Sequence, residues 1–307
     1  MDTELAPIAL FVYARPWHTR RTVQALQENP ESGRSELFIF SDAPRDASAS
    51  RGVDEVREYI KNITGFKSVN VVERSTNYGL ANSIIAGVSY MLSSFDRVVV
   101  VEDDLLTSKY FLGYMNRCLD LFEQASDVVC VHGYSYPVSI DHVEYYFLRG
   151  ADCWGWATWR RGWALFEEDS SKLLTTIEDL DIADQVNLGG AINITEMLQK
   201  QVLGSIDSWA VRWYASAFIA GGYTVYPSRS LVQNIGFDGS GTHCGAIDDF
   251  EVQLSPASIN LPLSAVDVVV EEDPRIYRAI KKFLIRERRV KWLFRALRRV
   301  ASRVFRY

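Results

Sequence analysis

The sequence has few of the features that mark secreted, zinc-binding or membrane-spanning proteins. Its 307 residues include four cysteines, spread far apart and without a Cys-x-x-Cys pair, which argues against a disulfide framework and a zinc site. The first residues lack the basic and then apolar layout of a signal peptide. No apolar run approaches the ~20 residues that a membrane-spanning helix needs. We therefore expect a cytoplasmic protein, or one attached to the cytoplasmic face of a membrane.

Two phosphate-binding signatures are also missing. No Gly-x-Gly-x-x-Gly follows the first apolar segment, which disfavours a nicotinamide-type Rossmann site. The chain has no Gly-rich run ending in Gly-Lys-Ser or Gly-Lys-Thr, which excludes a P-loop. Its four histidines are scattered, and none pairs with an evident nucleophile. Carboxylates and the basic C-terminal region remain as the main chemical signals.

The chain does contain an apolar segment that runs directly into three acids. Residues 97–104 read Arg-Val-Val-Val-Val-Glu-Asp-Asp. The valines predict a strand buried on both faces, as in the middle of a parallel sheet. Carboxylates at its end do not serve packing, because they repel one another and lose hydration. We predict that Glu102, Asp103 and Asp104 bind Mg²⁺ or Mn²⁺ with phosphates, the alternative being a solvated turn.

Strands alternate with helices through the first half of the chain, which predicts an α/β fold with a doubly wound, mostly parallel sheet and helices on both faces. The expected strands are 7–14, 36–40, 68–73 and 98–101, and the expected helices are 18–27, 53–62 and the segment from Asn77 onward. Beyond these, helices are expected at 110–124, 173–203 and 209–220, and strands at 128–132 and 223–232.

Polar residues follow the first predicted strands. Arg15 and Asp42 should project at the same sheet edge as the acidic cluster, where open α/β sheets bind ligands. An arginine there can bind phosphate or a base, and an aspartate can accept from a ring N–H or a ribose hydroxyl. Asn77 and Gly79 open the next helix, whose N-terminus favours anions, although ordinary capping explains them equally well.

In this order, Arg15, Asp42, Asn77-x-Gly79-Leu80 and Val-Val-Val-Glu-Asp-Asp resemble the nucleotide-sugar half of inverting GT-A glycosyltransferases. The likeness is greatest to N-acetylglucosaminyltransferase I and to bacterial sugar transferases of polysaccharide clusters, and it covers about residues 7–245. It implies that Glu-Asp-Asp is the DxD motif. Asp104 would then bind Mn²⁺ with Asp103 in support, and Glu102 would face the sugar or ribose. Arg15, Asp42, Asn77 and Gly79 would contact the nucleotide-sugar.

The second half carries looser parts of the resemblance. Ile206-Asp207-Ser208-Trp209 is similar to an Asp-Asp-Trp segment whose first aspartate is the proposed base, which implies Asp207, although serine replaces the second acid. The stretch 153–159 resembles a Gly-Trp segment beside the sugar. Trp154, Trp156 and Trp209 can stack on sugars, or they can pack in the core. His243 closes a glycine-rich segment similar to a loop that orders over the donor.

The activity that the resemblance implies is metal-dependent, inverting transfer of a hexosyl or N-acetylhexosaminyl group. The donor would be a nucleotide-sugar, UDP-linked, and the acceptor a glycan or lipid-linked glycan of surface polysaccharide synthesis. Residues 1–125 would bind the nucleotide-sugar and residues 126–250 the acceptor, within one GT-A domain. The alternatives are a nucleotidyltransferase that makes sugar nucleotides and a catalytically inactive GT-A-like binding protein. Tyr13-Ala-Arg-Pro-Trp does not supply the Gly-rich loop that a nucleotidyltransferase needs.

Charge divides the chain into an acidic body and a basic tail. Residues 275–307 carry thirteen Lys or Arg and one acid, +12, so the −6 total leaves −18 for the remainder. Apolar residues recur there at helical spacing, which predicts an amphipathic helix on anionic lipid rather than a nucleic-acid partner. A helix docked on the acidic body is the other alternative. Residues 251–274 are expected to be a linker.

Overall fold

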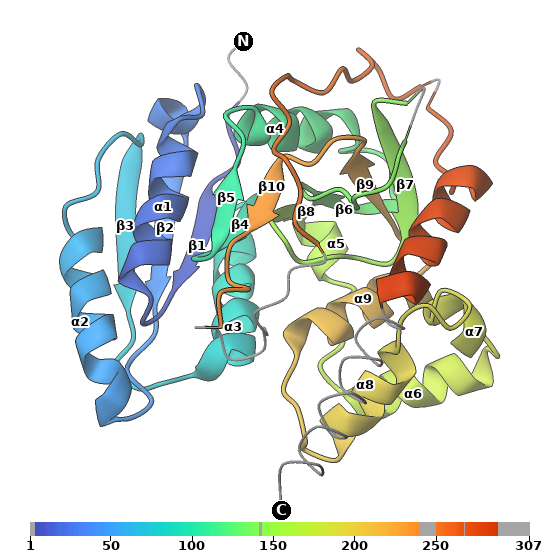
Figure 1. Cartoon of the computed structure of the whole chain (residues 1–307), viewed down its shortest axis with the longest axis horizontal. Coiled ribbons are helices and arrows are strands. Elements are labelled where there is room, and N and C mark those ends of the chain that lie inside the picture. The colour runs from blue at the N-terminus through green and yellow to red at the C-terminus, as the bar shows by residue number, and fades with distance from the viewer. Residues whose placement is uncertain (1–3, 141–142, 240–249, 267, 288–307) are drawn as a thin grey trace, which may run out of the picture.

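The computed structural model describes residues 4–140, 143–239, 250–266 and 268–287 (Figure 1). In chain order the elements are β1 (Ile8–Val12), α1 (Pro16–Gln27), η1 (Ser32–Arg34), β2 (Glu36–Ser41), α2 (Ala47–Ile60), β3 (Ser68–Glu73), α3 (Gly79–Ser94), β4 (Arg97–Glu102), β5 (Leu105–Thr107), α4 (Phe111–Leu121), β6 (Val128–His132), β7 (Tyr145–Arg149), β8 (Trp156–Trp159), α5 (Arg160–Trp163), α6 (Ser170–Asp179), α7 (Ala183–Val186), α8 (Ile194–Val202), α9 (Trp209–Ile219), β9 (Tyr223–Pro227) and β10 (Val232–Asn234). Residues 274–287 are also helical.

Within the described residues, eight strands form one sheet in the order β3-β2-β1-β4-β8-β6-β9-β7. The strands β3, β2, β1 and β4 are parallel, as are β6 and β9, whereas β8 and β7 run antiparallel to their neighbours. The predicted mostly parallel α/β sheet is therefore confirmed. A separate antiparallel pair joins β10 to β5.

Four strands were not expected from the sequence, namely β5, β7, β8 and β10. β5 and β10 have three residues each, too few to show a period. β8 is buried along its whole length, so it has no alternation of apolar and polar residues. It reads as a short aromatic run, which a buried helix could equally contain.

Helices cover both faces of the sheet and bury β4 between them. Val99 and Val101 pack in a core that α1, α2 and α4 complete, while Val98 and Val100 pack in a second core with α3 and α9. Figure 1 shows α1 and α4 on the viewer's side of the sheet and α3 behind it. The valine run is thus a strand buried on both faces, as its composition predicts.

The functional residues expected from different elements meet at one edge of this sheet. β1, β2 and β4 are parallel, with Val12 opposite Ser41 and Phe11 opposite Glu102, so Arg15, Asp42 and the acidic cluster follow their carboxyl ends. α9 leads back into β9, which is parallel to β6, so the start of α9 lies at the same edge. One edge therefore carries residues from both halves of the chain.

The segments expected as a linker and a basic tail both contact the body within the described residues. In the segment 251–274, Ser255 donates its backbone N–H to Ser230 O at 2.8 Å and accepts from Ser108 Oγ at 3.0 Å, so this segment is strapped to the body. The helix at 274–287 buries Ile276, Ile280 and Phe283 against the body. The apolar side of this helix therefore packs on apolar side chains of β7 and β9 and not on a membrane. The rest of the predicted membrane helix, 288–307, lies outside the described residues.

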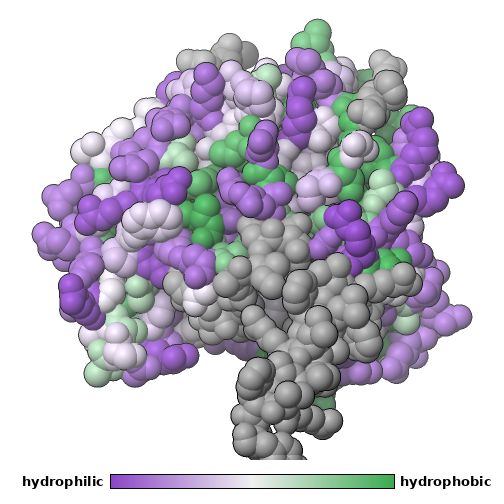
Figure 2. Space-filling model, viewed as in Figure 1, coloured by the Kyte–Doolittle hydropathy of each residue, from purple (hydrophilic) through white to green (hydrophobic). Residues whose placement is uncertain are grey.

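Two features of the structure bear on the expected membrane attachment. None of the helices in the described part of the chain is long and apolar enough to cross a bilayer. On the face seen in Figure 2, apolar residues form separate patches among hydrophilic ones. The exposed large apolar side chains nearest the carboxyl edge include Trp17, Tyr78 and Leu80.

Candidate functional site

A single arginine joins the two aspartates at the end of β4. Nη2 of Arg15 lies 2.5 Å from Asp103 Oδ1 and 2.9 Å from Asp104 Oδ2. The sequence places these residues almost ninety positions apart, and the pairing of β1 with β4 brings them together. Asp103 is nearly buried, with further bonds from Tyr13 N to Oδ2 and from Thr22 Oγ1 to its carbonyl. The carboxylates face one shared positive charge.

Burial and neighbouring charges shift the pKa values of groups in this cluster. Burial, followed by repulsion from Asp104 and Asp103, raises the pKa of Glu102 well above its ordinary value. Burial also raises the pKa of Asp103, and the Arg15 charge opposes this effect. For Arg15, burial disfavours the charged form, but the two aspartates outweigh it and raise the pKa of the guanidinium. The site is therefore built to hold positive charge.

The segment after β10 crosses over Asp104. Ile235 donates its backbone N–H to Asp104 O at 2.8 Å, and a Cβ on Gly236 would lie only 2.2 Å from Asp104 Oδ2. Only glycine permits this approach. Farther along, Asp238 Oδ2 lies 3.1 Å from His18 Nε2. The sequence analysis did not predict Gly236 or His18 as site residues, although the glycine-rich composition of 234–243 was a signal. His243 lies outside the described residues.

Asp42 lies at the expected edge, but it is fully engaged by the start of α3. Its carboxylate accepts from the backbone N–H of Tyr78 and Gly79, each at 2.9 Å, and from the amide of Asn77 at 3.1 Å. Gly79 has a φ of +73°, a backbone conformation that suits glycine. Asp42, Asn77 and Gly79 are thus brought together as a helix cap. Their contact with a nucleotide stays a prediction.

Asp207 lies just before α9, at the same edge of the sheet. Its side chain is 56% exposed and accepts from Arg212 Nη2 at 3.0 Å and Gln201 Nε2 at 3.1 Å. The next residue, Ser208, caps the helix with a bond from Val211 N to its hydroxyl. Asp207 is therefore a solvent-accessible carboxylate held in a fixed orientation. Its assignment as a base stays a prediction.

The three tryptophans expected to line the sugar site separate into two groups. Trp156 and Trp209 are buried, and their rings stack 5.5 Å apart beneath the start of α9. They belong to the core, because no sugar reaches a ring that is 0% or 3% exposed. Trp154 is partly exposed and touches Phe237, on the segment that crosses Asp104, with ring centroids 5.7 Å apart. Of the three, only Trp154 is partly exposed, and its contact with Phe237 places it against the segment that crosses Asp104.

The polar residues His132 and Asp152, next to Trp154, were not predicted from the sequence. His132 Nε2 accepts from Trp154 N at 3.0 Å, and Nδ1 lies 3.1 Å from Tyr134 O, which fits a neutral imidazole. Burial lowers the pKa of His132, in agreement with that neutral form. Asp152 accepts from the hydroxyl of Tyr136 at 3.1 Å. These bonds fix the chain between β7 and β8, and no sequence pattern marked them.

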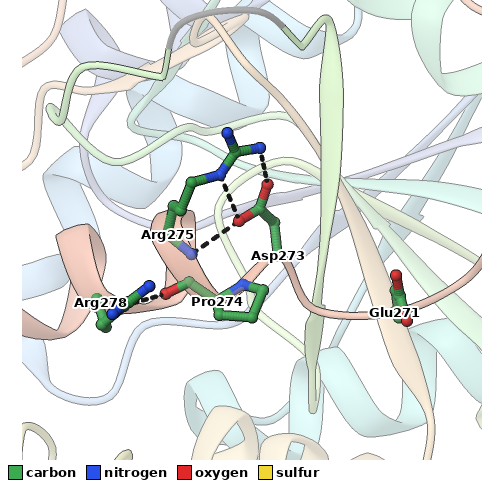
Figure 3. Close-up of a pocket in the computed structure, with 5 residues that line it drawn as sticks. All are labelled: Glu271, Asp273, Pro274, Arg275 and Arg278. Atoms are coloured by element: carbon green, nitrogen blue, oxygen red, sulfur yellow. Dashed lines mark hydrogen bonds and ion pairs between the residues drawn. The ribbon is translucent and has the colours of Figure 1, made fainter.

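A surface depression lies elsewhere, at the start of the helix 274–287. Figure 3 shows Asp273 holding the side chain and backbone N–H of Arg275, while Arg278 donates to Pro274 O. These contacts satisfy the first turn of the helix. Glu271 points away from them in the figure. We assign no chemistry to this depression.

The donor set at the end of β4 fits a hard divalent cation under one condition. Within the described residues, no three His, Cys, Asp or Glu side chains group in a way that could hold a metal ion. Asp103 and Asp104 nevertheless direct carboxylate oxygens at one point, and Mg²⁺ commonly takes only one or two carboxylates together with phosphates. A cation can bind there only if the Arg15 guanidinium moves away from the two carboxylate oxygens.

No protein-family model and no curated protein sequence matches the chain. Among solved structures, it is similar to the mannosyltransferase PcManGT from Pyrobaculum calidifontis in complex with GDP-Man and Mn²⁺, with 16% identity and a TM-score of 0.33 over 43% of this chain and 36% of that one. It is also similar to S. aureus TarS, with 9% identity and a TM-score of 0.44 over 76% and 37% of the two chains. The chain is similar to S. aureus TarS 1–349 as well, with 11% identity and a TM-score of 0.41 over 74% of this chain and 59% of that one.

The chain therefore spans less than two thirds of each of these solved chains. TM-scores of this size and identities this low establish neither a common fold nor a common activity.

Proposed function

We propose that the protein is an inverting glycosyltransferase of GT-A type that transfers a hexosyl or N-acetylhexosaminyl group from a nucleotide-sugar, UDP-linked, to a glycan or lipid-linked acceptor of a surface polysaccharide. The observation that carries the proposal is the shared charge site of Arg15, Asp103 and Asp104 at the carboxyl edge of a mostly parallel sheet. Open α/β sheets bind ligands at this edge. A diphosphate with a divalent cation matches one cationic and two anionic side chains.

The chain's own residues divide the work of binding. Asp103 and Asp104 hold Mn²⁺ or Mg²⁺, and Arg15 binds the diphosphate, for which a guanidinium offers paired donors. When bound, the metal offsets the negative charge that develops on the departing diphosphate. The segment that passes Asp104 at Gly236, together with Trp154, lies beside the donor and limits the access of water. Asp42 acts by positioning Asn77 and Gly79.

The chemical step is one displacement at the anomeric carbon. The acceptor oxygen forms the new bond on one side of the sugar while the bond to the diphosphate oxygen breaks on the other. Asp207 takes the proton of the acceptor hydroxyl, a role that requires a carboxylate within reach of the acceptor. Its exposure and its place at the start of α9, on the same edge as Asp104, support this assignment.

Binding of sugar nucleotides by the full chain tests the proposal. The thermal midpoint would be measured with UDP-, GDP- and CMP-sugars, each with and without Mn²⁺, followed by chromatographic detection of the released UDP, GDP or CMP. We expect a stabilisation by one class of sugar nucleotide that depends on Mn²⁺. A response to nucleoside triphosphates instead would indicate a nucleotidyltransferase. No response to any nucleotide would indicate a binding protein without transferase activity.

Membrane attachment is proposed only for residues 288–307, because the preceding turns pack on the body. Flotation with vesicles that contain phosphatidylserine would compare the full chain with a chain that ends at Glu287, which keeps the packed helix. We expect the full chain alone to float, since clustered basic residues bind anionic lipid. Equal behaviour of the two chains would rule out this attachment.

A further inference from the structure

Arg15 occupies the point toward which Asp103 and Asp104 both direct an oxygen. One nitrogen, Nη2, makes both contacts, at 2.5 and 2.9 Å. A divalent cation bound by the same two oxygens would stand in nearly the same place, since its bonds to oxygen are ~2.0–2.2 Å long. The guanidinium and the metal therefore exclude one another.

The arginine also supplies what the acids need while no metal is bound. The side chains of Asp103 and Asp104 are only 6% and 13% exposed, so water screens their mutual repulsion poorly. A guanidinium remains charged at every physiological pH. Arg15 therefore neutralises one of the two negative charges, and a divalent cation would neutralise both.

The local structure lets the arginine side chain leave without disturbing the backbone. Arg15 O accepts from both Thr19 N and Thr19 Oγ1, each at 3.0 Å, so the main chain is tied to the first turn of α1. Its side chain is 23% exposed and makes no bond to its own helix terminus. The contacts with Asp103 and Asp104 can therefore break without the loss of these backbone bonds.

We propose that Arg15 is a resident counter-ion that keeps divalent metal off Asp103 and Asp104 until a nucleoside diphosphate draws the guanidinium away. The inference rests on the proposed function for the identity of the two ligands. It assigns a positioning role to Arg15 and predicts an order of ligand binding. The free protein binds Mn²⁺ weakly, and the diphosphate and the metal each strengthen the binding of the other. This coupling is reciprocal by thermodynamic necessity.

Mn²⁺ binding to the full chain, measured by electron paramagnetic resonance, tests the order without any measurement of activity. Titrations would be run alone and with saturating UDP or GDP, for the wild type and for Arg15→Gln. We expect the nucleotide to tighten Mn²⁺ binding to the wild type at least ~5-fold, the lower end of common coupling. In Arg15→Gln, we expect Mn²⁺ alone to bind at least ~5-fold more tightly than in the wild type, and the gain from nucleotide to be smaller than in the wild type, because only the direct contact of phosphate with metal remains.

Two variants serve as controls. Arg20→Gln removes a charge from the same helix, where the guanidinium lies 4.7 Å from the Tyr59 ring centre, and should bind Mn²⁺ like the wild type. Arg15→Lys keeps a positive charge near the aspartates and should restore weak metal binding. If Arg15→Gln does not fold, Arg15→Met, which keeps an unbranched side chain without the charge, replaces it and should bind Mn²⁺ alone at least ~5-fold more tightly than the wild type.

The possible results are distinguishable. Equal Mn²⁺ affinity of the wild type and Arg15→Gln, or independent binding of metal and nucleotide to the wild type, would overturn the counter-ion role and leave the proposed function intact. No Mn²⁺ binding to any variant, even with nucleotide, would overturn both this inference and the metal part of the proposed function.

Discussion

The ends of β2 and β4 lie at the same edge of the sheet, and each carries an aspartate that is used differently. Asp42 accepts from backbone and amide donors that belong to the fixed start of α3. The Asp104 carboxylate instead pairs with the guanidinium of Arg15. An aspartate whose partners are backbone donors stabilises the fold, whereas one that pairs with a cationic side chain is the one that, in the role proposed for Arg15, exchanges its partner for a ligand.

The largest effect is expected at the end of β4. Asp104→Asn removes a metal ligand, and we expect the rate of transfer to fall roughly 100- to 1,000-fold, because charge on the leaving diphosphate is no longer offset. The measurement is sugar transfer at saturating Mn²⁺. The matched control is Asp96→Asn, at an exposed residue whose side chain is 87% accessible. Near-normal transfer that still requires metal would reject the ligand assignment.

A smaller effect is expected at the start of α9. Asp207→Asn should lower kcat about 100-fold, because an amide cannot take the proton of the acceptor hydroxyl. UDP binding, measured by calorimetry, should not change, since the bonds of Asp207 within the described part of the chain go to Arg212 and Gln201 and not to the residues assigned to the nucleotide. Retention of full turnover would move the base to another residue. A parallel loss of UDP affinity would indicate a structural role instead.

At the end of β2 the expected effect is on stability. Asp42→Ala leaves the N–H groups of Tyr78 and Gly79 without their acceptor in a partly buried place, and we expect a loss of about 2 kcal/mol in the free energy of unfolding. Urea unfolding measures this loss. Asp96→Ala should be close to neutral. If Asp42→Ala weakens nucleotide binding and leaves stability unchanged, Asp42 belongs with Asp104 among the ligand-binding residues.

The smallest effect is expected at the cap of α9. Ser208→Ala removes a hydroxyl that accepts from Val211 N at 3.4 Å, and we expect a loss of about 1 kcal/mol. Ser208→Thr keeps the hydroxyl and should retain most of the stability, as urea unfolding would show. A loss as large as that of Asp42→Ala would mean that the cap also holds Asp207 in place.

Several parts of this arrangement were predictable from local sequence. The valine run at 98–101 predicted a buried central strand, because a continuous run of β-branched residues is typical of a strand that is buried on both faces. The alternation of strands and helices predicted parallel strands whose carboxyl ends share an edge, and hence the approach of Arg15 to Asp103. The roles of the tryptophans could not be predicted in this way. Stacking on a sugar and packing in a core select the same residue type, and only burial separates Trp154 from Trp156.

By itself, the sequence determined the fold class, the acidic end of β4 and the excess of positive charge after residue 275, since these depend on the local order of residue types. Tertiary structure decided that Asp42 bonds to the start of α3 and Asp104 to Arg15, that Gly236 passes over Asp104, and that the first turns of the basic helix pack on the body. These contacts join residues that lie far apart in the chain, so local sequence carries no signal for them. The acidic cluster and its arginine were visible in the sequence, but only the fold showed that one guanidinium nitrogen contacts both Asp103 and Asp104.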